Sequence, residues 1–328
     1  MSLIRSNCPR CGSFESVTIT TTPDYELNIH LPFEVSRCSS CSFVYTSVRP
    51  DFKTLFSEFY PDNYICYGSK QYWLASVIDH QRIKKQALQR FNCIKKYLSP
   101  ENSRILEVGC ATGEFLKLCL RYSNEVYGIE PNRVLFDSLS KSGIKMFNST
   151  LEETDIEKSS FDLICLFNVF EHLWDPVQSL YKLNSLLRPD GVLMLEVPNF
   201  DSPWRKIFQN HWFLYHLPRH LSHFTSGILS GLMADSGFDK VNISKQFRPT
   251  VNVLSLKYVI RDRFQSRCLS TIFKESNPIV LGMAVLAELF SNFCFDSNIM
   301  LCIYRKTKDV VNRPSLIEEK QYDITRAV

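Results

Sequence analysis

The stretch Arg104-Ile-Leu-Glu-Val-Gly-Cys-Ala-Thr-Gly113 decides the fold of this chain. Its first half is an apolar run of strand length, and its second half is a turn of small residues that opens at Gly109. Residues 114–122 then place apolar side chains at the spacing of a helix. A strand, a glycine-bearing turn and a helix in this order are typical of the first unit of a parallel α/β sheet.

The same alternation continues on the carboxyl side of this unit. Apolar runs predict further strands, and periodic segments between them predict helices. We expect strands at 126–130, 145–147, 161–167 and 192–197, and helices at 134–140 and 177–187. This order predicts a Rossmann-like, doubly wound α/β sheet with helices on both faces. Ligands of such sheets bind at the carboxyl ends of the strands.

Two acids help to choose between the cofactors that such a turn can hold. The spacing Gly109-x-Ala111-x-Gly113 departs from the usual dinucleotide fingerprint. Glu107 lies inside the first strand, where a carboxylate is costly unless it is paired. S-adenosylmethionine carries an ammonium group that could pair with it, and NAD does not. Glu130 ends the second strand and could accept hydrogen bonds from both ribose hydroxyls. The alternative for Glu107 is a core acid held by backbone donors.

Further motifs spread over roughly residues 100–305. They are Ile105-Leu-Glu-Val-Gly-Cys-Ala-Thr-Gly113, Tyr127-Gly-Ile-Glu-Pro131, Phe161-Asp-Leu-Ile164, Asn168-Val-Phe-Glu-His172, Leu187-Arg-Pro-Asp-Gly191, Val197-Pro-Asn199, Pro218-Arg-His-Leu-Ser-His-Phe-Thr225 and Ser236-Gly-Phe238. Together they resemble class I S-adenosylmethionine-dependent methyltransferases, with Ala111 in place of the middle glycine of the first motif. The resemblance implies a seven-stranded sheet whose last strand, 299–304, runs antiparallel.

The same resemblance implies a set of cofactor-binding residues. Glu107 and the turn residues Gly109, Cys110, Ala111 and Gly113 would approach the methionine end of S-adenosylmethionine. Glu130 would hold the ribose, and Leu151 and Glu152 would frame the adenine. Asn168, Val169 and Phe170 would line the methyl side.

Residues 1–48 carry two cysteine pairs, Cys8-Pro-Arg-Cys11 and Cys38-Ser-Ser-Cys41. Two such pairs can complete a tetrahedral four-sulfur zinc site, which has no open position and is therefore structural. The chain between them alternates like a β-hairpin, with Pro23-Asp24 as its turn. These features predict a zinc ribbon. A redox-active disulfide pair is the alternative.

Residues 49–99 form an aromatic and then a basic segment. Tyr60-Pro-Asp-Asn-Tyr64 is placed like a substrate lid, and residues 72–98 predict a helix with a solvated basic face. A ribbon, a Tyr-rich lid and a methyltransferase core in this order resemble bacterial sugar C-methyltransferases, which act on nucleotide-linked deoxysugars. The methyltransferase domain is expected at 100–308, including an inserted helical pair, and a loose polar tail at 309–328.

Histidines supply the candidate chemistry. His172, beside Glu171, follows the fourth strand and could act as a general base, with Glu171 raising its pKa. Alternatively, His172 caps a helix or braces a loop. A second group could contact a substrate such as a sugar, bind a metal or simply pack; its members are His216, Arg219, His220 and His223.

Composition limits the remaining function classes. The 328 residues are 45% hydrophobic and 13% aromatic, which excludes disorder as the dominant state. A net charge of +4 does not demand a nucleic-acid partner. Scattered single cysteines, and the absence of an apolar signal segment, predict a soluble cytoplasmic protein.

The apolar run 278–295 is interrupted by Glu288 and is short for a membrane span, although its basic flanks could touch a membrane surface. The leading hypothesis is S-adenosylmethionine-dependent methyl transfer to a sugar, nucleotide-sugar or related small metabolite in surface-glycan assembly. An RNA or protein methyltransferase that grips a polymer, and a non-catalytic scaffold, are the alternatives. The sequence does not predict an oligomeric state.

Overall fold

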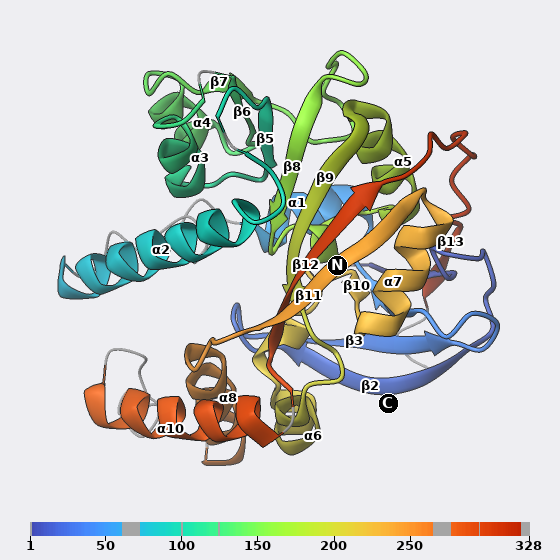
Figure 1. The fold of residues 1–328 in the computed structure, drawn as a ribbon. Helices are drawn as coiled ribbons and strands as arrows, with labels where there is room; N and C mark the ends of the chain where they lie inside the picture. Colours follow the sequence, from blue (N-terminus) through green and yellow to red (C-terminus); the bar gives the residue numbers. More distant parts are fainter. Residues whose placement is uncertain are drawn as a thin grey trace.

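The computed structural model describes residues 2–60, 73–99, 101–123, 125–264, 277–294 and 296–322. Two β-sheets organise these residues (Figure 1). A seven-stranded sheet with helices on both faces forms the larger part, and a second sheet built mainly from the N-terminal residues packs beside it.

The seven-stranded sheet has the order β11-β12-β9-β8-β5-β6-β7. Its strands are β5 (Ile105–Val108), β6 (Val126–Ile129), β7 (Lys145–Phe147), β8 (Phe161–Phe167), β9 (Leu187–Pro198), β11 (Phe238–Gln246) and β12 (Ile299–Lys306). β12 pairs antiparallel with both β9 and β11, whereas β5, β6, β7, β8 and β9 pair parallel. The predicted doubly wound sheet and its antiparallel last strand are confirmed.

Helices cover the two faces of this sheet through separate apolar clusters. One face buries side chains of α2 (Trp73–Ile94), α3 (Glu114–Cys119) and α4 (Arg133–Leu139). The other buries side chains of α5 (Pro176–Leu186) and α7 (Ser226–Asp235). Short helices η2 (Phe170–His172), α6 (Pro203–Phe208), η3 (Gln209–His211) and η4 (Phe213–Tyr215) lie in the connections after β8 and β9. These connections supply much of the candidate site.

A helical pair is inserted between β11 and β12, as expected. It consists of α8 (Thr250–Phe264) and α10 (Pro278–Cys294), which contact each other. Glu288 of α10 is fully buried and accepts a hydrogen bond from Asn252 Nδ2 at 2.7 Å. The charge that interrupts the apolar run therefore has a partner on α8. Among the described residues, no helix has both the length and the apolar character needed to cross a membrane.

The second sheet contains β1 (Leu3–Ser6), β2 (Ser16–Asp24), β3 (Ile29–Cys38), β4 (Val44–Arg49), β10 (Ser222–His223) and β13 (Glu319–Tyr322), and helix α1 (Phe52–Phe59) follows β4. The hairpin turn lies at 25–28, not at the predicted Pro23-Asp24, because the Asp24 carboxylate accepts hydrogen bonds from Glu26 N and Leu27 N beyond the strand. Pro23 falls at an irregularity of the edge strand β2, where a missing N–H is tolerated.

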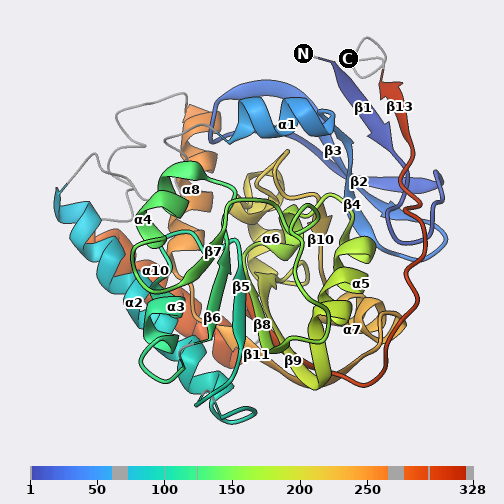
Figure 2. The same cartoon turned by 90° about the horizontal axis from the view of Figure 1, so that it is seen from above.

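The C-terminal residues correct a second expectation. The predicted loose tail instead contains a strand, β13, which pairs antiparallel with β1 (Figure 2). Asn7 also donates a side-chain hydrogen bond to Leu316 O at 2.7 Å. Residues far apart in the sequence thus form one edge of the second sheet.

Candidate active site

The turn after β5 is built from residues in left-handed backbone conformations. Gly109, Ala111 and Gly113 have φ angles of 65°, 46° and 67°. A Cβ atom on Gly109 would lie 2.6 Å from Val169 Cγ2, so the ends of β5 and β8 approach too closely for a side chain there. The predicted cofactor turn and the predicted methyl-side residue Val169 are therefore neighbours.

Glu130 holds this turn in place. Its carboxylate accepts hydrogen bonds from Ala111 N at 2.8 Å and from Asn132 N at 2.9 Å. Burial raises the pKa of the Glu130 carboxyl group against the lowering effect of these donors. An ionised carboxylate has room for about four hydrogen bonds, so Glu130 could still accept from ribose hydroxyls.

Glu107 is the buried acid that the sequence singled out. Its Oε2 atom is buried and has no hydrogen-bond partner among the described residues. Burial raises its pKa to about 8, although Arg90 acts in the opposite direction. A buried carboxylate oxygen without a partner fits the ammonium group of S-adenosylmethionine, since the cofactor would supply the missing counter-charge. The residues present therefore fit this cofactor, with Glu107 and Glu130 as its anchors.

A buried cluster of two arginines and one acid was missed in the sequence. Arg90 of α2 and Arg248 both bind the Glu196 carboxylate, with shortest N···O distances of 2.8 and 3.0 Å. Burial alone would raise the pKa of Glu196, but the two guanidinium groups lower it to about 2. The sequence predicted that the basic face of α2 is exposed to solvent. Arg90 departs from this prediction, because its side chain is largely buried against Glu196. The signal available was an acid within the apolar run 192–197, the same signal that identified Glu107.

The other predicted cofactor residues divide between exposed and core positions. Asn168 Nδ2 lies 3.4 Å from Glu196 Oε1 at the end of β8. Leu151 is buried, and the Glu152 carboxylate accepts a hydrogen bond from Ser179 on α5. The ring of Phe170 is fully buried and stacks on Phe224, with ring centroids 5.0 Å apart. Phe170 was expected to line the methyl side of the cofactor site. Its side chain packs in the hydrophobic core instead.

Glu171, His172, His220 and Tyr60 meet beside this end of the sheet. Tyr60 Oη lies 2.9 Å from His172 Nδ1, and the rings of His172 and His220 are 4.5 Å apart, nearly perpendicular. Both oxygens of Glu171 are buried with no hydrogen-bond partner in the part of the chain that the structure describes. The structure therefore brings together residues that the sequence placed in separate catalytic and substrate groups. Tyr64 lies outside the described residues.

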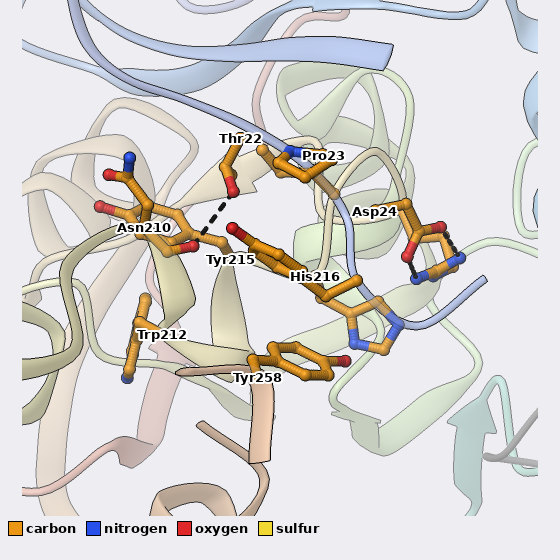
Figure 3. A pocket seen from close by; sticks show the side chains of 11 residues that line it. Thr22, Pro23, Asp24, Asn210, Trp212, Tyr215, His216 and Tyr258 are labelled. Carbon is orange, nitrogen blue, oxygen red and sulfur yellow. Dashed lines mark hydrogen bonds and ion pairs between the residues drawn. The ribbon is translucent and has the colours of Figure 1, made fainter. Parts of the chain in front are cut away.

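The remaining members of the predicted substrate group have structural partners. Arg219 is fully buried and binds Asp24 at 2.8 Å and Glu26 at 3.0 Å. His216 Nε2 lies 2.8 Å from the same Glu26. Asp24, His216 and Arg219 line a small pocket with Tyr258 between β2 and the 209–219 segment (Figure 3). Their contacts join the second sheet to the connection after β9.

His223 lies in β10 and is not placed to meet a substrate. It is 2% exposed, its Nε2 is 3.2 Å from Thr46 Oγ1, and its ring packs against Phe200 and Tyr215. Burial lowers the pKa of His223 to about 3. We therefore correct its expected substrate role to a structural one.

The electrostatic expectation for His172 is wrong in sign. Burial, followed by the nearby Arg219 charge, lowers the pKa of His172 to about 4. Glu171 does not oppose this shift, because burial raises the pKa of its own carboxyl group to about 8. His172 is thus a neutral imidazole near pH 7, whose lone pair is available to a proton or a metal ion.

The four N-terminal cysteines converge as predicted. Cys8 Sγ lies 3.5 Å from Cys41 Sγ, and Cys11 Sγ lies 3.5 Å from Cys38 Sγ. Their sulfur atoms all lie within 4.8 Å of one another. Sulfur atoms on a tetrahedral zinc ion, each about 2.3 Å from the metal, have similar separations.

Comparison with known proteins defines the class. Residues 78–243 match the family described as "Methyltransferase domain", and the chain belongs to this family. A protein described as a probable S-adenosylmethionine-dependent methyltransferase from Mycobacterium tuberculosis is 25% identical over 162 residues, covering 48% of this chain and 57% of that protein. The chain spans little more than half the length of this relative.

Other relatives carry names that point to different methylated atoms. The ubiquinone biosynthesis O-methyltransferase of Rhodopseudomonas palustris is 28% identical over 36% of this chain and 49% of its own length. The C-methyltransferase NovU of Streptomyces niveus is 24% identical over 46% of this chain and 36% of its own length. A solved S-adenosylmethionine-dependent methyltransferase from Archaeoglobus fulgidus is 19% identical, with a TM-score of 0.45 and coverage of 68% of this chain and 94% of that one.

Proposed function

We propose that this protein is an S-adenosylmethionine-dependent methyltransferase that acts on a small hydroxylated metabolite, with a sugar or nucleotide-sugar as the leading candidate. The observation that carries the proposal is the unpartnered Glu107 carboxylate beside the glycine turn, with Glu130 bound to the same turn. Membership of the methyltransferase family supports the cofactor. The order of cysteine module, aromatic segment and core, which resembles sugar C-methyltransferases, supports the acceptor.

The cofactor supplies an activated methyl group on a sulfonium centre, so the chain mainly binds and orients. Glu107 would pair with the ammonium and Glu130 with the ribose, and the close packing of Gly109 on Val169 would position the methyl side. Transfer of the methyl group to the acceptor would release S-adenosylhomocysteine and one proton from the acceptor atom. Polar side chains beside the end of β8, Tyr60 and His172 among them, would orient the acceptor.

The test has two stages. Calorimetry should first show that S-adenosylmethionine binds in preference to NAD; tighter binding of NAD would refute the cofactor assignment. Incubation with the cofactor and a panel of nucleotide-sugars should then give a product heavier by one methylene unit in mass spectrometry. If no sugar is methylated while RNA binds with a steep dependence on salt, the polymer alternative replaces the sugar proposal.

We also propose a structural zinc ion on Cys8, Cys11, Cys38 and Cys41. The convergence of the four sulfur atoms supports it. Metal analysis of the purified protein should find zinc that Cys38→Ser removes. Unchanged zinc content in that variant would refute the assignment.

A further inference from the structure

A carboxylate and two imidazoles meet in the cluster of Glu171, His172 and His220. One possible ligand atom from each residue lies within 4.8 Å of the others. His220 Nε2 is 3.9 Å from Glu171 Oε1, which is too far for a hydrogen bond. Two ligands that each lie about 2.0–2.2 Å from a tetrahedral zinc ion are roughly 3.4 Å apart. The Glu171 and His220 side chains would thus need to approach each other by roughly 0.5 Å to share one ion.

Glu171 lacks the partners that a buried acid normally has. Its side chain is 0% exposed, and neither carboxylate oxygen has a hydrogen-bond partner among the residues described. More than about nine in ten buried polar groups in native proteins are satisfied, so an orphaned carboxylate needs an explanation. A bound cation would satisfy both its charge and its lone pairs.

Backbone carbonyls hold both histidine rings. His220 Nδ1 lies 2.9 Å from Leu214 O, and His172 Nδ1 lies 3.1 Å from Arg219 O. A carbonyl oxygen can only accept, so His220 Nδ1 carries the proton and its Nε2 keeps its lone pair. His172 Nδ1 has Tyr60 Oη as a second neighbour at 2.9 Å, and this hydroxyl can donate or accept. Histidine ligands are commonly fixed in this way by a carbonyl or carboxylate on the other ring nitrogen.

Acids and basic groups both flank the cluster. Asp24 and Glu26 both bind Arg219, and Glu26 also contacts His216, whose ring stacks on His220 at 4.9 Å. Lys257 acts on Glu26 as well, and the Arg219 charge affects His172 more strongly than Glu26 does. The unpartnered Glu171 carboxylate and the two imidazoles, and not the surrounding charge, therefore favour a cation in the cluster.

We infer that Glu171, His172 and His220 form a binding site for one divalent transition-metal ion of the zinc type, separate from the cysteine site. Two imidazole nitrogens and one carboxylate oxygen are ligands that Zn²⁺ prefers in sites with three protein ligands, which leave a position open. His172 is then a ligand and not a free base.

The absorption spectrum of bound Co²⁺ distinguishes this site from the cysteine site. The purified protein is treated with a mild chelator that leaves the four-sulfur site loaded, and Co²⁺ is then added. We expect one further equivalent of Co²⁺ to bind, with visible d–d absorption and without the sulfur-to-metal charge-transfer band that thiolate ligands produce. A parent protein that takes up no Co²⁺ outside the cysteine site would overturn the inference, whatever the variants do.

Variants identify the ligands. Glu171→Gln and His220→Gln should each weaken Co²⁺ binding by at least roughly 100-fold, because losing a ligand costs no less than losing a residue that supports one, which costs roughly 10–100-fold. His211→Gln is the matched control, because His211 lies in the same connection but pairs with Asp262 at 2.7 Å. S-adenosylmethionine binding, which rests on Glu107 and Glu130, reports whether each variant is folded and separates this inference from the proposed function. Parent-like Co²⁺ binding by folded Glu171→Gln would refute it.

Discussion

Two buried acids next to one turn differ in what surrounds them, and the difference has consequences for cofactor binding. Glu130 accepts two backbone hydrogen bonds, from Ala111 and Asn132, whereas Glu107 has a bare oxygen. The pKa of Glu107 is about 8 in the folded chain and about 4.5 as an ordinary glutamate. Because the folded chain holds a proton that the unfolded chain has lost, this group lowers the stability of the cofactor-free protein as pH rises from about 4.5 to about 8.

Binding of the cofactor should therefore expel a proton from Glu107. Between about pH 6 and 7.5, where an α-ammonium group stays charged, affinity for S-adenosylmethionine should rise with pH by up to about tenfold per unit. Glu107→Gln should flatten this dependence and weaken binding by roughly tenfold to a hundredfold, the loss of a charged hydrogen-bond partner. Calorimetry across this range measures both effects, with exposed Glu157→Gln as the control. A parent affinity that does not vary with pH would contradict the ammonium assignment.

At the scale of elements, the segments that follow β5 and β8 pack closely where Gly109 meets Val169. An alanine there must adopt a φ of 65° and place its Cβ 2.6 Å from Val169 Cγ2. Gly109→Ala should lower the free energy of unfolding by roughly 1–3 kcal/mol and weaken cofactor binding. Gly282→Ala in α10 is the control, since no atom lies within 4 Å of the added Cβ. This variant should raise the free energy of unfolding by roughly 0.5–1 kcal/mol. Denaturant titrations of both variants measure the two changes in the free energy of unfolding. Equal changes in the two variants would refute the predicted close packing at Gly109.

The elements were largely predictable because their signals are local. Apolar runs and the glycine turn lie within single segments, so the succession of strands and helices along the chain and the placement of Glu107 and Glu130 follow from them. The antiparallel last strand was implied by the resemblance to a known family. Side-chain partners across elements were not predictable in this way. Arg90 meets Glu196 across 106 positions of sequence, and Arg219 meets Asp24 across 195, so neither segment carries a sign of the other. The contacts within the cluster of Glu171, His172 and His220 were not predictable for the same reason. Its members come from two connections that only the fold brings together.

For the whole molecule, the C-terminal segment closes the edge of the second sheet. β13 covers β1, and Glu319 lies 3.6 Å from the guanidinium of Arg49, which is 2% exposed. Tyr322 also donates a hydrogen bond to Glu34 at 2.8 Å. The tail thus supplies a counter-charge to the buried Arg49 and backbone hydrogen-bond partners to β1. Removing the tail would leave the arginine without its counter-charge and the strand with an open edge, and both changes are unfavourable.

A chain that ends at Asp309 should therefore unfold more easily than the full chain, by roughly 1–3 kcal/mol, because Arg49 keeps its burial but loses Glu319. It should also aggregate more readily, since the exposed edge of β1 can pair with another chain. Cofactor affinity should stay near that of the parent, because Glu107 and Glu130 lie in the other sheet. The matched control is a chain that ends at Tyr322, which keeps β13 and all of these contacts. Thermal melts with light scattering compare the three chains, and equal melting temperatures for the two truncations would show that β13 contributes nothing to stability.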